Sequence, residues 1–97
     1  MPTYISLIDY TQKGIENMRD SPERLEKAKE VTESVGGEYR AFYLTMGGYD
    51  AVYVADFPDA ESAAQALLTV AGAGAVQTET LRAFSEDEYR DIIDGLP

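Results

Sequence analysis

The side chains of this chain that could carry chemistry are tyrosines, carboxylates and a few arginines. Tyrosine occurs seven times, whereas cysteine and histidine are both absent. Without cysteine there is no disulfide, no thiolate nucleophile and no thiolate ligand for a metal. Without histidine there is no imidazole base and no ordinary ligand set for zinc, copper or haem. A hard cation held by carboxylates would remain, but no EF-hand spacing occurs, and we therefore expect neither a metal nor an organic cofactor.

The most distinctive motif is Gly47-Gly48-Tyr49-Asp50, which allows two interpretations. A tight turn explains it without chemistry, because glycine supplies positive backbone dihedrals and an aspartate can cap turn amides. Alternatively, Tyr49 and Asp50 lie at the rim of a cavity between subunits, where they would contact a ligand. Both interpretations stay open at the level of the sequence.

A second polar pattern runs along the last predicted strand, where Thr78, Glu79, Thr80 and Arg82 interrupt the apolar residues. An exposed edge strand protected by polar side chains explains this pattern. Alternatively, Arg82 is a cation beside a tyrosine-lined pocket and suits a carboxylate or enolate ligand. Asp9 and Glu79 would act as bases only if burial raised their pKa.

The chain is strongly acidic, with a formal net charge of −10 from eighteen acidic and eight basic residues. Such a surface repels phosphate and anionic lipid, so we expect neither nucleic acid nor a membrane as a partner. Either a salt-rich cytoplasm, where counterions screen self-repulsion, or simple solubility explains the acidity. No apolar run approaches the ~20 residues of a membrane span, and Met1–Tyr4 lacks the features of a secretory signal. A cytoplasmic location is therefore expected.

Four strands and three main helices are predicted along the 97 residues, which is the length of one domain. Ser21-Pro22-Glu23 offers a capping hydroxyl followed by proline at the first helical position, and Gly36-Gly37 permits a left-handed helix end. A short helical turn is expected over 12–19. The predicted strands cover 3–10, 38–46, 51–56 and 76–84, and the main helices begin at Ser21, Pro58 and Ser85.

This order predicts an α+β fold, a ferredoxin-like βαββαβ antiparallel sheet with the helices on one face and an extra C-terminal helix, in a single domain over residues 1–97. Alternation along the strands assigns side chains to the two faces of the sheet. The side chains predicted to face the helices are Ile5, Leu7, Phe42, Leu44, Val52 and Val54. The opposite, uncovered face is then rich in tyrosine and consists of Tyr4, Ser6, Ile8, Tyr10, Tyr39, Ala41, Tyr43, Thr45, Ala51, Tyr53 and Ala55.

Such a face is too apolar to remain in water, so we expect the chain to bury it against a second copy of itself. In one alternative the two sheets pack directly and the tyrosines form a dry interface. In the other, small residues among the tyrosines leave a cavity between the sheets, where phenols hydrogen-bond a small molecule. The candidate ligand-binding residues are Tyr4, Tyr10, Tyr43, Tyr49, Asp50, Tyr53 and Arg82.

Several segments together resemble the GYD-domain family, which is named for its Gly-Tyr-Asp motif, here Gly48-Tyr49-Asp50 within the run Phe42–Val52. The resemblance covers nearly the whole chain and leaves little but the C-terminal helix outside. It implies a fold of the dimeric α/β-barrel type, a class that includes sensing domains of leucine-responsive regulators and cofactor-independent monooxygenases and isomerases. The other matching segments are Asp9-Tyr10-Thr11, Gly14-Ile15, Ser21-Pro22-Glu23-Arg24, Phe57-Pro58-Asp59 and Thr78–Phe84.

Three functions are compatible with these observations. The first is a homodimeric small-molecule-binding module with a tyrosine-lined cavity between sheets. The second is a cofactor-independent enzyme of the dimeric-barrel type, using tyrosines, Arg82 and a carboxylate, and the third is a structural or interaction protein. A closed cavity of ligand size separates the first two from the third. A carboxylate or a phenol with a shifted pKa inside it would favour the enzyme, whereas a neutral lining would favour binding, which is the function that we expect.

Overall fold

The computed structural model describes residues 1–97 and contains a four-stranded antiparallel sheet with the strand order β2-β3-β1-β4. β1 (Thr3–Tyr10) lies at the centre and pairs with β3 (Ala51–Asp56) on one side and β4 (Val76–Ala83) on the other. β2 (Glu38–Leu44) pairs with β3 and forms one edge of the sheet. The predicted α+β ferredoxin-like fold is confirmed.

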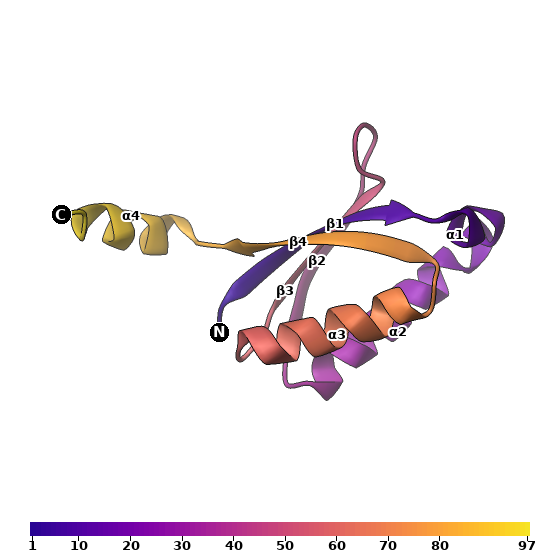
Figure 1. Cartoon of the computed structure of the whole chain (residues 1–97), viewed down its shortest axis with the longest axis horizontal. Helices are drawn as coiled ribbons and strands as arrows, with labels where there is room; N and C mark the ends of the chain where they lie inside the picture. The colour runs from indigo at the N-terminus through magenta and orange to yellow at the C-terminus, as the bar shows by residue number, and fades with distance from the viewer.

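The helices cover one face of this sheet, with one exception. α2 (Ser21–Ser34) packs against β2 and α3 (Ala60–Gly72) packs against β4, and the two helices also contact each other. Before α2, the chain forms α1 (Gln12–Glu16) and a short 3₁₀ segment (Met18–Asp20), as predicted for 12–19. The exception is α4 (Glu86–Asp94), which continues from the end of β4 and extends away from the body of the molecule (Figure 1).

The ends of the helices agree with the sequence in most details. Asp59 precedes α3 and its side chain accepts a 2.7 Å hydrogen bond from the backbone N–H of Ser62. α2 ends where Gly36 adopts a φ of 84°, the left-handed conformation that glycine tolerates best. The capping role predicted for Ser21 is wrong, because Ser21 is already the first residue of the helix. Its hydroxyl instead lies 3.4 Å from the hydroxyl of Tyr10.

The predicted assignment of side chains to the two faces is wrong for β1 and β3, where it was inverted, whereas in β2 Phe42 lies under the helices as predicted. Ile5 lies opposite Val54, and Leu7 lies opposite Val52, on the face that the helices leave open. Tyr53 and Ala55 instead form the core with α3, so the tyrosine-rich face is the covered one. The strand side chains that lie under the helices are Tyr4, Ser6, Ile8, Tyr10, Tyr39, Phe42, Tyr53, Ala55, Val76 and Thr78.

Hydrogen bonding explains why the tyrosines lie under the helices. The hydroxyl of Thr32 on α2 lies 2.8 Å from the phenol oxygen of Tyr53 and donates to the backbone oxygen of Ala28 at 2.9 Å. Tyr53 therefore has a polar partner inside the layer, which a buried phenol requires. An irregularity between Tyr39 and Ala41 shifts the register of β2 and lets this edge strand also direct rings toward the helices.

The connection between β2 and β3 is a wide hairpin that projects from the end of the sheet (Figure 1). Of the two hairpin glycines, Gly47 has a positive φ, of 136°, and Gly48 does not, so the predicted tight turn with positive angles at both glycines is wrong. Asp50 joins this hairpin to β1: its side chain accepts a 2.9 Å hydrogen bond from the N–H of Tyr10, and its own N–H donates to Ile8 at 2.8 Å. These contacts give Asp50 a structural role at the edge of the sheet.

Thr32→Val tests the explanation for the covered face. The substitution keeps the shape of the side chain but leaves the hydroxyl of Tyr53 with only its 3.5 Å hydrogen bond to the backbone oxygen of Ala28, so the free energy of unfolding in urea should fall by about 1–3 kcal/mol. Tyr53→Phe removes the hydroxyl, and the double variant should recover part of the loss because no phenol is then left unpaired. If the losses of the two single variants simply add, the two side chains do not interact.

Asp50→Ala tests the role of the hairpin contact. Removal of the acceptor leaves the amide of Tyr10 without its side-chain partner, and we expect the free energy of unfolding to fall by about 1–2 kcal/mol in urea titrations. Asp50→Asn is the matched control, because it keeps an acceptor oxygen at the same position and should retain most of the stability. An Asp50→Ala protein as stable as the parent would contradict the proposed anchoring of the hairpin.

Candidate functional site

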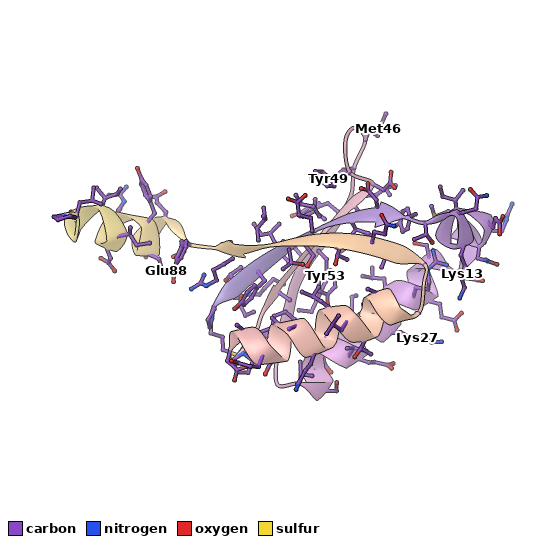
Figure 2. All side chains as sticks on the ribbon, viewed as in Figure 1. Lys13, Lys27, Met46, Tyr49, Tyr53 and Glu88 are labelled. Atoms are coloured by element: carbon purple, nitrogen blue, oxygen red, sulfur yellow. The ribbon has the colours of Figure 1, made fainter.

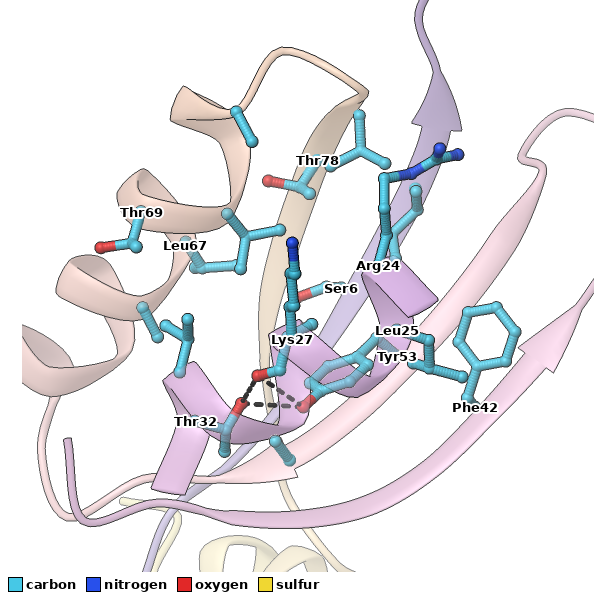
Figure 3. A pocket seen from close by; sticks show the side chains of 18 of the residues that line it. Ser6, Arg24, Leu25, Lys27, Thr32, Phe42, Tyr53, Leu67, Thr69 and Thr78 are labelled. Atoms are coloured by element: carbon cyan, nitrogen blue, oxygen red, sulfur yellow. Dashed lines mark hydrogen bonds between the residues drawn. The ribbon is translucent and has the colours of Figure 1, made fainter. Parts of the chain in front are cut away.

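A cavity of about 300 Å³ lies between the helices and the sheet of a single chain (Figure 3). Its 23 lining residues come from all four strands and from α2 and α3, and 16 of them are hydrophobic. The volume is at the lower end of the range found for small-molecule sites. This cavity lies within one chain, unlike the one expected in one alternative between the sheets of two chains.

Small side chains on the helices leave this space unfilled. α3 presents Ala63 and Ala66 to the sheet, and both are buried. α2 contributes Ala28 to the same lining. No large side chain of the chain is fully buried, in contrast with the interdigitated cores of most domains. The space under the helices consequently forms a pocket instead of a filled core.

Hydroxyl groups are the main polar feature of the lining. Tyr10 and Ser21 lie together at one end of the cavity. Ser6 is buried and its hydroxyl lies 2.9 Å from that of Thr80. Burial raises the pKa of the Tyr53 phenol, although its hydrogen bond with Thr32 partly offsets this effect. Tyr53 therefore stays protonated at neutral pH and is suited to hydrogen bonding.

No carboxylate lines the cavity, and its two charged side chains are Arg24 and Lys27, both on α2. Figure 3 shows the Lys27 side chain between α2 and α3, and Arg24 nearer the start of α2. General acid–base catalysis needs a proton-transfer group of suitable pKa within hydrogen-bond reach of the substrate. A lining of neutral hydroxyls and two cations is better suited to binding than to proton transfer.

The structure separates the tyrosines that we predicted to share one site. Tyr4, Tyr10 and Tyr53 line the cavity. Tyr43 is 63% exposed and lies on the open face, since it pairs with Val52. Tyr49 lies on the hairpin side of the sheet, opposite Tyr53 (Figure 2). A ligand in the cavity would therefore contact the first three tyrosines.

The remaining predicted site residues are occupied by structural contacts. Tyr49 donates a hydrogen bond to Glu79, and this bond, together with the nearby negative charge, raises the pKa of the phenol. Arg82 lies over the ring of Phe84 at 4.3 Å and forms a 3.6 Å ion pair with Glu88 at the start of α4. Neither side chain lines the cavity.

Several lining residues escaped the sequence analysis. Ser21, Arg24 and Val31 follow one another at three- and seven-residue spacing on one face of α2, and all three line the cavity. That spacing was a usable signal, but it is hard to recognise in a helix with so many charged residues. Ser6 was assigned to the wrong face of the sheet, and Thr78 was not assigned to either face.

Comparisons with known proteins agree with this architecture. A feast or famine regulatory protein from M. tuberculosis, solved with L-methionine, superposes with a TM-score of 0.64 at 19% identity, over 90% of this chain and 54% of that protein. The present chain thus spans about half of the regulatory protein's length. The structure of TTHA0845 from Thermus thermophilus gives a TM-score of 0.56 at 23% identity, covering 88% of this chain and 95% of that one. These similarities show the fold.

Sequence similarity gives the family. A "glutamine synthetase and cystathionine beta-lyase binding protein" from Thermus thermophilus is 38% identical over 84 residues, which cover 86% of this chain and 88% of that protein. The GYD domain matches residues 4–93, from β1 to the last turn of α4. The match includes the C-terminal helix that the resemblance had left largely outside. The chain belongs to the GYD-domain family.

Proposed function

We propose that this protein is a small-molecule-binding module that holds an apolar ligand between its helices and its sheet. The observation that carries the proposal is the cavity of about 300 Å³ with a mainly hydrophobic lining. The hydroxyls of Tyr10, Ser21 and Thr78 supply the few polar groups that orient a ligand in such sites. A protein of the same fold was solved with L-methionine, so this fold is compatible with small-molecule binding.

We further propose that the module self-associates through the open face of its sheet. That face carries β-branched and aliphatic side chains from three strands, and no part of the chain covers it. Leu81 on β4 is 44% exposed there. Apolar surface of this kind in a protein of this size is typical of an interface. The apolar residues of the open face are Ile5, Leu7, Tyr43, Val52, Val54 and Leu81, and Glu79, opposite Leu7, lies on the same face.

A second candidate function is the binding of other proteins. It is favoured by α4, whose apolar side chains recur at helical spacing and are all exposed: Tyr89 57%, Ile92 47% and Ile93 45%. The Thermus relative is named for binding glutamine synthetase and cystathionine beta-lyase. For this chain, the second candidate would be supported if it formed a complex with glutamine synthetase and if a substitution that fills the cavity left that complex unchanged.

None of the helices in this protein has the length and hydrophobicity of a membrane span.

Filling the cavity should abolish ligand binding. N-phenyl-1-naphthylamine, a neutral apolar probe whose fluorescence rises in apolar surroundings, should bind the parent protein saturably. Ala66→Leu places a larger side chain on a buried lining position, and we expect the affinity for the probe to fall by about tenfold or more. Circular dichroism and a melting curve would show that the variant is folded.

Ala64→Leu is the matched control, because Ala64 lies on the exposed side of the same helix. It should leave the affinity for the probe unchanged. Absence of saturable binding by the parent protein, or an equal loss of affinity in both variants, would contradict binding in the cavity.

A charge on the open face should prevent self-association. Val52→Asp places a carboxylate in the middle of the proposed interface, so native mass spectrometry should show dimers of the parent protein and monomers of the variant. Leu68→Asp on α3 is the control, since Leu68 is 74% exposed on the outer side of the helix. Leu81→Lys repeats the test at a second position of the open face. A monomeric parent protein at micromolar concentration, or disruption by Leu68→Asp alone, would contradict the proposed interface.

A further inference from the structure

We propose that the ligand of the cavity is an amphiphilic anion, with an apolar body under the helices and a carboxylate held by Lys27 and Arg24. The proposal rests on the cavity as a binding site and specifies the class of its ligand. Acidic residues outnumber basic ones by eighteen to eight in this chain, yet the two charged side chains of the lining are both cations. The local charge is thus opposite to the net charge of the protein.

Lys27 is not paired with a carboxylate. The ion pairs of the structure involve Lys29, Arg40, Arg82 and Arg90, and no hydrogen bond of the Lys27 ammonium occurs. Acidic residues three and four positions away on α2 are within reach of a lysine in a helix. In Figure 3 the Lys27 side chain instead extends from α2 toward α3 at the mouth of the cavity, where the residue is exposed. Its ammonium is therefore available to an anionic group that enters there.

Lys29 on the same helix shows the contrasting arrangement. Its ammonium forms a 3.1 Å ion pair with Glu26 and lies 4.5 Å from the centre of the ring of Tyr39. It does not line the cavity. Lys27 lines the cavity and has no ion-pair partner, whereas Lys29 is paired and lies outside the cavity. Lys29 is therefore a matched control for Lys27.

Arg24 is held in place by backbone oxygens. Its two terminal nitrogens donate to the carbonyl oxygens of Asn17 at 2.8 Å and Gly14 at 3.3 Å. A guanidinium has five N–H donors, so these two bonds leave others free. The contacts fix the position of the cation without neutralising its charge. Such a fixed donor is well suited to a carboxylate.

The lining changes character along the strands, which orients the proposed ligand. The hydroxyls of Tyr10 and Ser21 lie together at the start of α2, one turn before Arg24. At the opposite end lies Phe57, whose ring packs against that of Tyr4 with 5.8 Å between the ring centres. No charged side chain lines that end. The carboxylate is therefore placed at the Arg24 end and the apolar body toward Phe57.

Octanoate and octanol test the proposal, because they share an apolar body and differ in charge. Isothermal titration calorimetry with the parent protein should show tighter binding of octanoate. Lys27→Met keeps an unbranched apolar side chain of nearly the same length but removes the charge, and it should weaken octanoate binding by about tenfold while leaving octanol binding unchanged. Lys29→Met should change neither affinity.

The outcomes distinguish the ligand class from the cavity itself. Equal binding of octanoate and octanol, unaffected by Lys27→Met, would overturn the anionic ligand and leave the cavity as the site of an uncharged molecule. Equal weakening by Lys27→Met and Lys29→Met would overturn the contact with Lys27, because overall charge would then be responsible. If neither compound binds and the naphthylamine probe also fails, the proposed binding function fails with it.

Discussion

Both faces of this sheet carry large apolar side chains, and the helices of one chain cover only one of them. The covered face is the one with tyrosines, because Thr32 on α2 provides the hydroxyl partner that the phenol of Tyr53 needs. Most of the β-branched and aliphatic residues of the strands, which need no such partner, lie on the open face. This distribution of side chains accounts for the rest of the architecture. The layer between the helices and the sheet contains hydroxyl groups, and the open face of the sheet exposes apolar side chains to water.

The same distribution also explains why the interior is hollow. Large aromatic rings on the strands hold the helices away from the sheet, while alanines on α3 provide little volume to fill the gap. A domain of this length has little apolar surface to bury, so an unfilled layer lowers its stability further. A bound molecule that fills the space would compensate for part of this loss, and binding would then raise the stability of the folded chain.

The helices and strands were predictable from the sequence, but the face of the sheet on which each strand side chain lies was not. The strands at 3–10 and 51–56 agree with the prediction residue for residue, because their boundaries are marked by turn residues on both sides. Alternation distinguishes the faces of a strand only when one of them is polar, and here both carry large apolar side chains. The decisive contact, between Thr32 and Tyr53, joins residues 21 positions apart. The cations of the cavity were missed for a related reason, since α2 is a largely polar helix in which Arg24 and Lys27 resemble ordinary surface residues.

α4 has a consequence for how the protein could be observed. Its orientation is set by the capping box of Ser85 and Glu88, without tertiary packing, since none of its residues is buried. A helix of nine residues in water opens and closes readily, so its backbone amides should exchange with solvent quickly in an isolated chain. Contact with any partner would slow that exchange at the apolar positions. α4 is thus an intrinsic reporter of association, readable by hydrogen exchange without a label or a known ligand.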